Sequence, residues 1–596
     1  MKFILFLFFI ILTPIFSEDN LGFKKKQNID TNELEVFSEK FFREKKLEGK
    51  HVLVAIVKDN KSFFKVYPEH SKAFTELTQF NSVVFDEIFL TLHTLHLEEI
   101  GKLNLRSDIY NYKWKYNRNF KQSILIENLL THTTGIQENL IYSNLEKERP
   151  KDFWKNQLPA RFAEPNELIS YNPDHSVILK SILEEVNSKS LDEVMKETIL
   201  SKLELEKTNY ENQKLNINAK DIEKLLFLFL NPDLLAQNDI LKKETWNSMF
   251  QEKIRLEDKL PGSVIGFFEH YENKIWGYSR IAASNLSTEE FIFFPDKNTS
   301  FYIYTDSFDP DLRIEWKSEF LDHFFQNKKV KAKKDKNPGY EEYLKNFEGE
   351  YASVSISSQN ISKFRNYSSA IQIKQENRLL VLESGEIEPY GDLHGRLEFI
   401  EIDPFLFRCL DRESYISFKM NEAGDVEYLL SGSGQHGAYR KLPFHEKKSF
   451  QESILYFFIG FYSIYLILLI IEVPYSFAKK IAFVQNRMRR NTMILLWIET
   501  LLAISTFVGF YYFIQENKLS QVSEYILTGN SFDYALFTLP LLFIFVLSFL
   551  AYYSLKSFLE KGLHLYRQIQ TILFLVVSLG FIYWMSYWNL LVFLFN

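Results

Sequence analysis

The sequence has 596 residues with 70 lysines and arginines against 77 aspartates and glutamates, which gives a formal net charge of −7 at pH 7. The charges are mixed along the middle of the chain, so no basic face of the kind that nucleic acid requires is visible, and we exclude nucleic acid as a partner. The single cysteine, Cys409, excludes an intrachain disulfide. A chain of this length predicts two or more folding units, and the apolar residues gathered at both ends indicate a membrane protein.

Residues 1–17 predict a secretory signal peptide. Met1-Lys2 is a short positively charged n-region, and Phe3 to Phe16 is an apolar h-region. Ser17 is a small residue of the kind found at the cleavage site. The apolar run is short for a spanning helix, although a first transmembrane helix remains the alternative.

Residues 18–327 predict an α/β domain of enzyme size. His51 to Val57 is an apolar run typical of a buried strand, and Leu179 to Val186 has the spacing of an amphipathic helix. Within this region, Ile126 to Ile136 reads IENLLTHTTGI. It resembles the LLTHTSGL signature of the class C β-lactamase and D-alanyl-D-alanine carboxypeptidase family, the penicillin-binding protein-like serine hydrolases.

Three further segments follow that family's order: Glu98–Leu105, Phe162–Pro165 ahead of Tyr171, and Phe293–Asn298. The resemblance covers roughly residues 35–310 and implies a β-lactamase/transpeptidase-like fold. It also implies a serine nucleophile with a lysine three residues later, one helical turn away.

Neither catalytic residue is present at the positions that the resemblance assigns. Counts from two flanking segments both place the serine position on Val84 and the lysine position on Glu87. Valine has no hydroxyl to acylate, and glutamate reverses the charge where a lysine should take the serine proton. Shifting the frame to Ser82 does not restore the motif, because Phe85 then occupies the lysine position.

The second and third family motifs are also altered. The tyrosine-x-asparagine motif reads Tyr171-Asn172-Pro173, so a proline replaces the amide, and the third motif reads Tyr278-Ser279-Arg280, with Arg280 in place of a glycine. A buried charge there needs a partner, so we predict that Arg280 forms an ion pair with Glu87. The predicted binding cleft consists of Glu87, Tyr171, Asn172, Tyr278, Ser279 and Arg280, with no intact catalytic residue.

Histidines in the same region do not predict a metal site or a cofactor. His93 and His96 lie three residues apart on an expected helix, but we find no convincing third ligand for zinc. His132 belongs to the family signature, in which this histidine is mainly structural, and we expect a structural role for it here.

A basic linker at 328–339 and a small antiparallel β-barrel at 340–447 follow. The linker is charged and ends in Pro338-Gly339, whereas short alternating stretches such as Ala370–Ile373 and Tyr415–Phe418 predict strands. The second stretch leads into a turn at Asn421–Asp425. This region is similar to the lipocalin-like module that often follows the hydrolase domain in the family.

Residues 452–596 predict a transmembrane domain of four helices, at about 454–471, 493–514, 535–555 and 571–595. Basic residues gather in the connections after the first and third runs, which the positive-inside rule places in the cytoplasm. The chain is therefore expected to be a multi-pass protein of the cell membrane with residues 18–450 on the extracytoplasmic side. Glu499, inside the second run, indicates a helix contact, a functional role or a neutralised carboxyl.

The sequence favours a pseudoenzyme whose outer domain binds a ligand or partner, such as a cell-wall peptide or a protein, at the cell envelope. One alternative is an active hydrolase with a non-standard nucleophile, Ser82 or Ser279. Another is an envelope sensor or assembly subunit that acts through its transmembrane bundle.

Overall fold

The structure is a computed structural model, and its secondary structure divides into two compact units. It describes residues 32–591 apart from 46, 48, 69–72, 113, 115–119, 139–159, 252–253, 259, 285, 326–338, 360, 385–392, 394, 433–434, 436, 479–486, 516–530 and 561–564. The first unit joins 1–99, 192–251 and 275–326, and the second joins 100–191, 252–274 and 327–596. The predicted signal peptide at 1–17 and nearly all of the basic linker lie outside the described residues.

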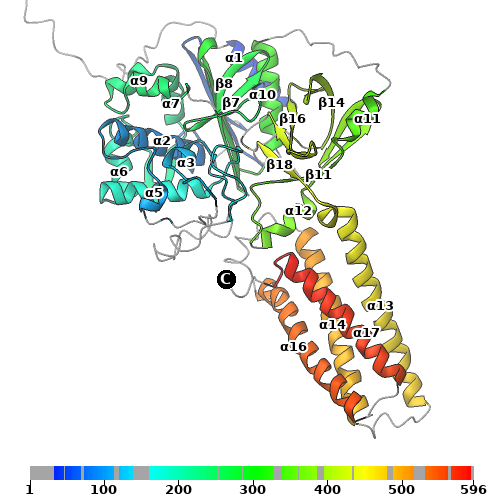
Figure 1. The fold of residues 1–596 in the computed structure, drawn as a ribbon. Helices are drawn as coiled ribbons and strands as arrows, with labels where there is room; N and C mark the ends of the chain where they lie inside the picture. The colour runs from blue at the N-terminus through cyan, green and yellow to red at the C-terminus, as the bar shows by residue number, and fades with distance from the viewer. Residues whose placement is uncertain are drawn as a thin grey trace, which may run out of the picture. The chain divides into compact units, whose positions relative to one another are not determined.

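The first unit is built on antiparallel strands covered by helices (Figure 1). Five of its strands pair in the order β2-β1-β10-β9-β8. Their bounds are β1 Val52–Lys58, β2 Lys61–Tyr67, β8 Ile275–Ser284, β9 Ser287–Phe294 and β10 Thr299–Thr305. The predicted strand at 51–57 corresponds to β1, in which the six residues Val52–Val57 are apolar and buried.

Helices and a small second sheet complete the first unit. The helices are α1 Asn32–Glu44, α2 Val83–Glu99, α6 Leu191–Met195, η3 Lys196–Leu200, α7 Asp221–Leu230, α8 Asp233–Gln237, α9 Lys243–Ser248, η4 Pro295–Lys297 and α10 Pro310–Phe324. The second sheet has the order β3-β5-β4, with bounds Gln79–Asn81, Lys214–Asn218 and Asn209–Glu211. Helix α2 is buried along most of its length, so its apolar residues do not form a single stripe.

The second unit begins with short helices and a hairpin. These are η2 Ile109–Tyr112, α3 Ile126–Leu130, α5 Asp174–Asn187, β6 Ser263–Val264 and β7 Phe267–Glu272. The predicted amphipathic helix at 179–186 lies within α5, which buries Ile178, Leu179, Ile182 and Leu183 along one face.

A closed eight-stranded antiparallel barrel follows in the second unit. Its strands are β11 Gly349–Ser353, β12 Ile371–Glu376, β13 Leu379–Ser384, β14 Gly395–Asp403, β15 Leu406–Cys409, β16 Tyr415–Met420, β17 Val426–Ser431 and β18 Ala438–Lys441, accompanied by α11 Tyr340–Lys345, η5 Ile361–Phe364 and α12 Arg365–Ser368. Strand β11 pairs with both β12 and β18, which closes the barrel. Aromatic rings fill the interior, among them Phe347, Tyr351, Phe407 and Phe418. The predicted turn after β16 is confirmed, because the Asn421 side chain accepts from the N–H groups of Ala423 and Asp425.

After the short helix η6 (Phe444–Glu446), four long helices pack side by side as a bundle (Figure 1). They are α13 Lys448–Ala478, α14 Arg487–Gln515, α16 Ser531–Leu559 and α17 Leu565–Tyr587. Within the described residues, four segments are long and apolar enough to cross a membrane: Lys448–Glu472, Arg490–Gly509, Thr538–Leu559 and Leu565–Tyr587.

The last helix differs from the predicted run at 571–595. It begins at Leu565, before the apolar run. Its first turn contains Arg567, which pairs with Glu472 of α13. It ends at Tyr587, shortly before Asn589 takes a left-handed conformation with φ of 57°. The predicted antiparallel barrel and the four predicted apolar helices are confirmed.

Candidate functional site

The start of α2 is the place where the family's nucleophile is expected. Val84 is the second residue of α2 and fully buried, and Glu87 lies three residues later, about one turn away on the same side. The helix begins here because the Ser82 hydroxyl accepts a hydrogen bond from the Phe85 N–H at 3.2 Å. No acylable side chain therefore stands at the serine position.

Glu87 is paired across the site with Arg280 of β8. The Arg280 Nε and Nη2 atoms lie 2.7 and 2.6 Å from Oε2 of Glu87. Both residues are 3% exposed. The predicted ion pair is confirmed, and it replaces a catalytic lysine with two charges that neutralise each other.

A second buried carboxylate, Glu289 on β9, holds the first turn of α2. Its Oε1 accepts from the backbone N–H groups of Val83 and Val84 at 2.7 and 3.2 Å. Its Oε2 accepts from the hydroxyls of Ser82 and Tyr302 at 2.7 and 2.5 Å. The free N–H groups at the start of a helix and the positive end of its dipole favour an anion. In α2 the Glu289 carboxylate takes this place.

Burial governs the ionisation of this cluster. Desolvation raises the pKa of Glu289 to about 7, although the hydrogen bonds from Tyr302 and Ser82 favour the charged form. Burial, and then the charge of Glu289, raise the pKa of the Tyr302 phenol well above its ordinary value. The Tyr302 phenol therefore keeps its proton and remains a hydrogen-bond donor to Glu289.

Sequence reasoning missed Glu289, although the strand carried a signal. Ser287 to Phe294 reads STEEFIFF, with two adjacent acids in an otherwise apolar strand. Because side chains alternate along a strand, Glu289 faces α2 while Glu290 faces α10, where its carboxylate pairs with Arg313 at 2.6 Å. Adjacent acids within an apolar strand indicate buried partners on both faces of the sheet.

Neither of the two candidate replacement nucleophiles is accessible. Ser82 is completely buried and donates its hydroxyl proton to Glu289, and Ser279 on β8 is 1% exposed. A substrate carbonyl has no route to either hydroxyl in this conformation. The burial of Ser82 and Ser279 speaks against the active-hydrolase alternative.

Tyr171, Asn172 and Pro173 belong to the second unit, where they precede α5. Asn172 accepts from the Asp174 N–H at 2.9 Å and donates to the Ile136 carbonyl at 3.3 Å, and Pro173 directly precedes the helix. Tyr171 is 1% exposed, with its ring centroid 4.8 Å from that of His132. The segment thus has a structural role at the start of α5.

His132 is also held by hydrogen bonds within the second unit. Its Nδ1 accepts from the Asn172 N–H at 3.3 Å, so the proton in the 2.9 Å contact between the two Nδ1 atoms belongs to His175. The His175 Nε2 is then an acceptor for the Thr134 hydroxyl at 2.8 Å. These hydrogen bonds hold the two imidazole rings in place, which agrees with a structural role for His132.

The face of β8 that carries Arg280 also presents two aromatic rings. Trp276, Tyr278 and Arg280 alternate along the strand and so project from the same face. Trp276 is 37% exposed and Tyr278 is half-buried, with its ring centroid 4.3 Å from that of Phe250. The rings of Trp276 and Tyr278 are therefore partly exposed to solvent next to the buried ion pair of Arg280 and Glu87.

Comparison with known proteins identifies this part of the chain. The family profile described as Beta-lactamase matches residues 52–218. These residues form a β-lactamase-related domain. The matched segment includes Val84 and Glu87 as well as Tyr171 to Pro173, so the predicted resemblance to the β-lactamase-related family is confirmed for residues 52–218.

Solved structures similar to the chain share little sequence with it. The octameric penicillin-binding protein homologue from Pyrococcus abyssi is 15% identical, with 69% of this chain and 100% of that chain covered and a TM-score of 0.41. The β-lactamase/D-alanine carboxypeptidase from Pseudomonas syringae is 13% identical, with coverage of 49% and 99% and a TM-score of 0.40. A search of curated proteins found no match.

Proposed function

We propose that the chain is a membrane-anchored pseudoenzyme of the β-lactamase-related family that binds a cell-envelope ligand without acylation. The buried pair of Glu87 and Arg280 at the former lysine position carries this proposal. A general base must accept the proton of the serine hydroxyl, whereas the charges of Glu87 and Arg280 already neutralise each other. Val84 has no nucleophilic atom. The four apolar helices supply the anchor, with residues 18–450 on the extracytoplasmic side.

The proposed ligand contacts the aromatic face of β8, not the former nucleophile position. Glu87, Ser279 and Arg280 are almost completely buried, whereas Trp276 and Tyr278 retain exposed ring surface. Aromatic rings contribute large contact area at a small cost in side-chain entropy, which suits a peptide or sugar ligand. A cell-wall peptide ending in D-alanyl-D-alanine is the ligand that the family resemblance favours.

Titration of the full chain in detergent with such a peptide tests the proposal. We expect saturable binding that leaves the peptide intact, and loss of binding in the variants Trp276→Ala and Tyr278→Ala. Phe308→Ala is the matched control because Phe308 is 43% exposed in the same unit but lies outside β8. Cleavage of the peptide would instead support the active-hydrolase alternative, and absence of binding would remove this peptide as the ligand.

A second candidate function, signalling through the bundle, is favoured by contacts between the barrel region and α17. Lys363 donates to the Tyr587 carbonyl at 2.7 Å, and the Tyr587 hydroxyl donates to Glu446 at 2.6 Å. Phe364 also packs edge-on against Trp588. Expression of the bundle alone, and a test of whether it supports the phenotype of the full chain, distinguishes this role from anchoring.

A further inference from the structure

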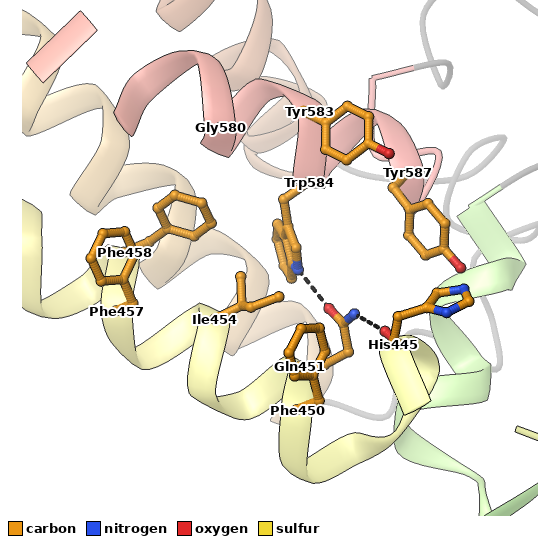
Figure 2. Close-up of a pocket in the computed structure, with 10 residues that line it drawn as sticks. All are labelled: His445, Phe450, Gln451, Ile454, Phe457, Phe458, Gly580, Tyr583, Trp584 and Tyr587. Atoms are coloured by element: carbon orange, nitrogen blue, oxygen red, sulfur yellow. Dashed lines mark hydrogen bonds between the residues drawn. The ribbon is translucent and has the colours of Figure 1, made fainter. Parts of the chain in front are cut away.

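A pocket of about 470 Å³ lies between α13 and α17, at the end of the bundle that directly follows the barrel in the chain (Figure 2). Its walls are mainly apolar and aromatic, with Ile454, Phe457 and Phe458 from α13 and Trp584 from α17. These residues lie within the candidate membrane spans Lys448–Glu472 and Leu565–Tyr587. The pocket is thus lined by helices that are long and apolar enough to cross a membrane.

The pocket exists because large side chains hold the two helices apart and one glycine leaves the gap unfilled. Further into the bundle, Phe458 contacts Phe581 with ring centroids 5.2 Å apart, and the Tyr462 hydroxyl lies 3.1 Å from the Ser578 hydroxyl. Gly580 contributes no side chain, and a Cβ placed there would be 3.8 Å from the nearest atom, on Phe458. A larger residue at 580 would therefore grow into the pocket.

The inner polar groups of the pocket are satisfied by each other. The Gln451 carbonyl oxygen accepts from the indole N–H of Trp584 at 2.8 Å, and its amide donates to the His445 carbonyl (Figure 2). The same oxygen accepts from the indole N–H of Trp588 at 3.1 Å. Gln451 is only 4% exposed. The wall consequently has little hydrogen-bonding capacity to offer and suits an aliphatic chain.

The rim of the pocket is polar and carries more positive than negative charge. His445 lines it, and the neighbouring Glu446 pairs with Arg440 at 2.7 Å and accepts from Tyr587. The Lys363 ammonium lies 3.6 Å from the centroid of the Tyr587 ring. The two cations Arg440 and Lys363 thus lie near the Glu446 carboxylate beside this end of the pocket.

We propose that this pocket binds one acyl chain of a membrane phospholipid, with the phosphate at the rim formed by His445, Arg440 and Lys363. From Gln451 to Phe458 the lining extends about 10 Å along α13 at 1.5 Å per residue, roughly a third of the hydrocarbon thickness. The bilayer itself supplies acyl chains to a pocket between such helices. Burying methylene groups between aromatic walls is favourable, and the excess positive charge at the rim favours a phosphodiester.

Native mass spectrometry of the full chain tests this proposal after transfer from phosphatidylcholine and phosphatidylglycerol nanodiscs into mild detergent. The wild-type chain should retain about one phospholipid. Gly580→Leu should lower retention about tenfold, because overpacking costs about 1–3 kcal/mol. Gly460→Leu should retain lipid as the wild type does, because Gly460 lies on α13 outside the pocket lining and has no atom within 4 Å of an added Cβ.

Ile454→Phe provides a second filling variant from the opposite wall, so the result does not depend on the folding of one mutant. Quenching of tryptophan fluorescence by phospholipids with brominated acyl chains should also decrease in Trp584→Phe, because Trp584 lines the pocket. Absence of retained phospholipid in the wild type, retention of detergent alone, or equal retention in both filling variants would overturn the proposal.

Discussion

Arg280 and Glu87 form a buried ion pair in which Nη2 of Arg280 lies 2.6 Å from Oε2 of Glu87. The side chains of these residues are 4% and 2% exposed, so each charge depends on the other for compensation. Such a pair is weak evidence for added stability, since desolvation offsets the attraction, but loss of one partner leaves an isolated buried charge. Replacing either residue alone should therefore destabilise the domain more than replacing both.

Arg280→Met should destabilise the full chain by about 3–5 kcal/mol in chemical unfolding, because it leaves the Glu87 carboxylate unpaired. The double variant Glu87→Leu, Arg280→Met should recover most of that loss. Lys345→Met is the control, because the pair of Lys345 and Glu342 is largely exposed and should contribute less than about 1 kcal/mol. Additive effects of the two buried substitutions would contradict the coupling.

Glu289 should make stability depend on pH. Burial raises the pKa of Glu289 from its ordinary value of 4.5 to about 7. Its contribution to the free energy of unfolding is therefore complete below pH 4.5 and is lost as the pH rises through about 7. Glu289→Gln should flatten the fall in unfolding free energy across this window by up to about 3 kcal/mol, since an amide resembles the protonated acid. Glu138 also has a pKa of about 7 and should keep a residual slope. Identical pH profiles of wild type and variant would refute this assignment.

Ser82 should tolerate alanine better than aspartate, the reverse of the usual order at a helix start. Ser82→Ala removes a cap and should cost about 1 kcal/mol. Ser82→Asp keeps a capping oxygen but places a second carboxylate beside Glu289, which now lies 2.7 Å from the serine hydroxyl. Thermal unfolding at pH 8 measures both, and a more stable aspartate variant would show that Glu289 does not hold this position.

Glu499 should be replaceable by glutamine without loss of stability. It is completely buried in α14, and neither carboxylate oxygen has a hydrogen-bond partner within the described part of the chain. An ionisable group at such depth is costly, so Glu499→Gln should leave the melting temperature in detergent unchanged or raise it. A marked decrease would indicate a partner or a functional role for the carboxyl.

The sequence predicted features that depend on a local pattern, or on the need of a buried charge for a partner of opposite charge. Arg280 and Glu87 could be paired because both replace family residues at positions that face one site. Glu289 could not be assigned to the start of α2, because its role depends on which face of β9 meets that helix. The apolar runs located four helices, but the ends of α17 depend on Arg567, which pairs with Glu472, and on the backbone at Asn589.

Intact-mass measurement of the full chain after incubation with a fluorescent penicillin and with a fluorophosphonate tests most directly whether the β-lactamase-related domain forms an acyl-enzyme. An active class C β-lactamase serves as the positive control for both reagents. We predict that the mass of this chain stays unchanged at concentrations that modify the control completely. A stoichiometric adduct on any serine between residues 18 and 327 would contradict the account.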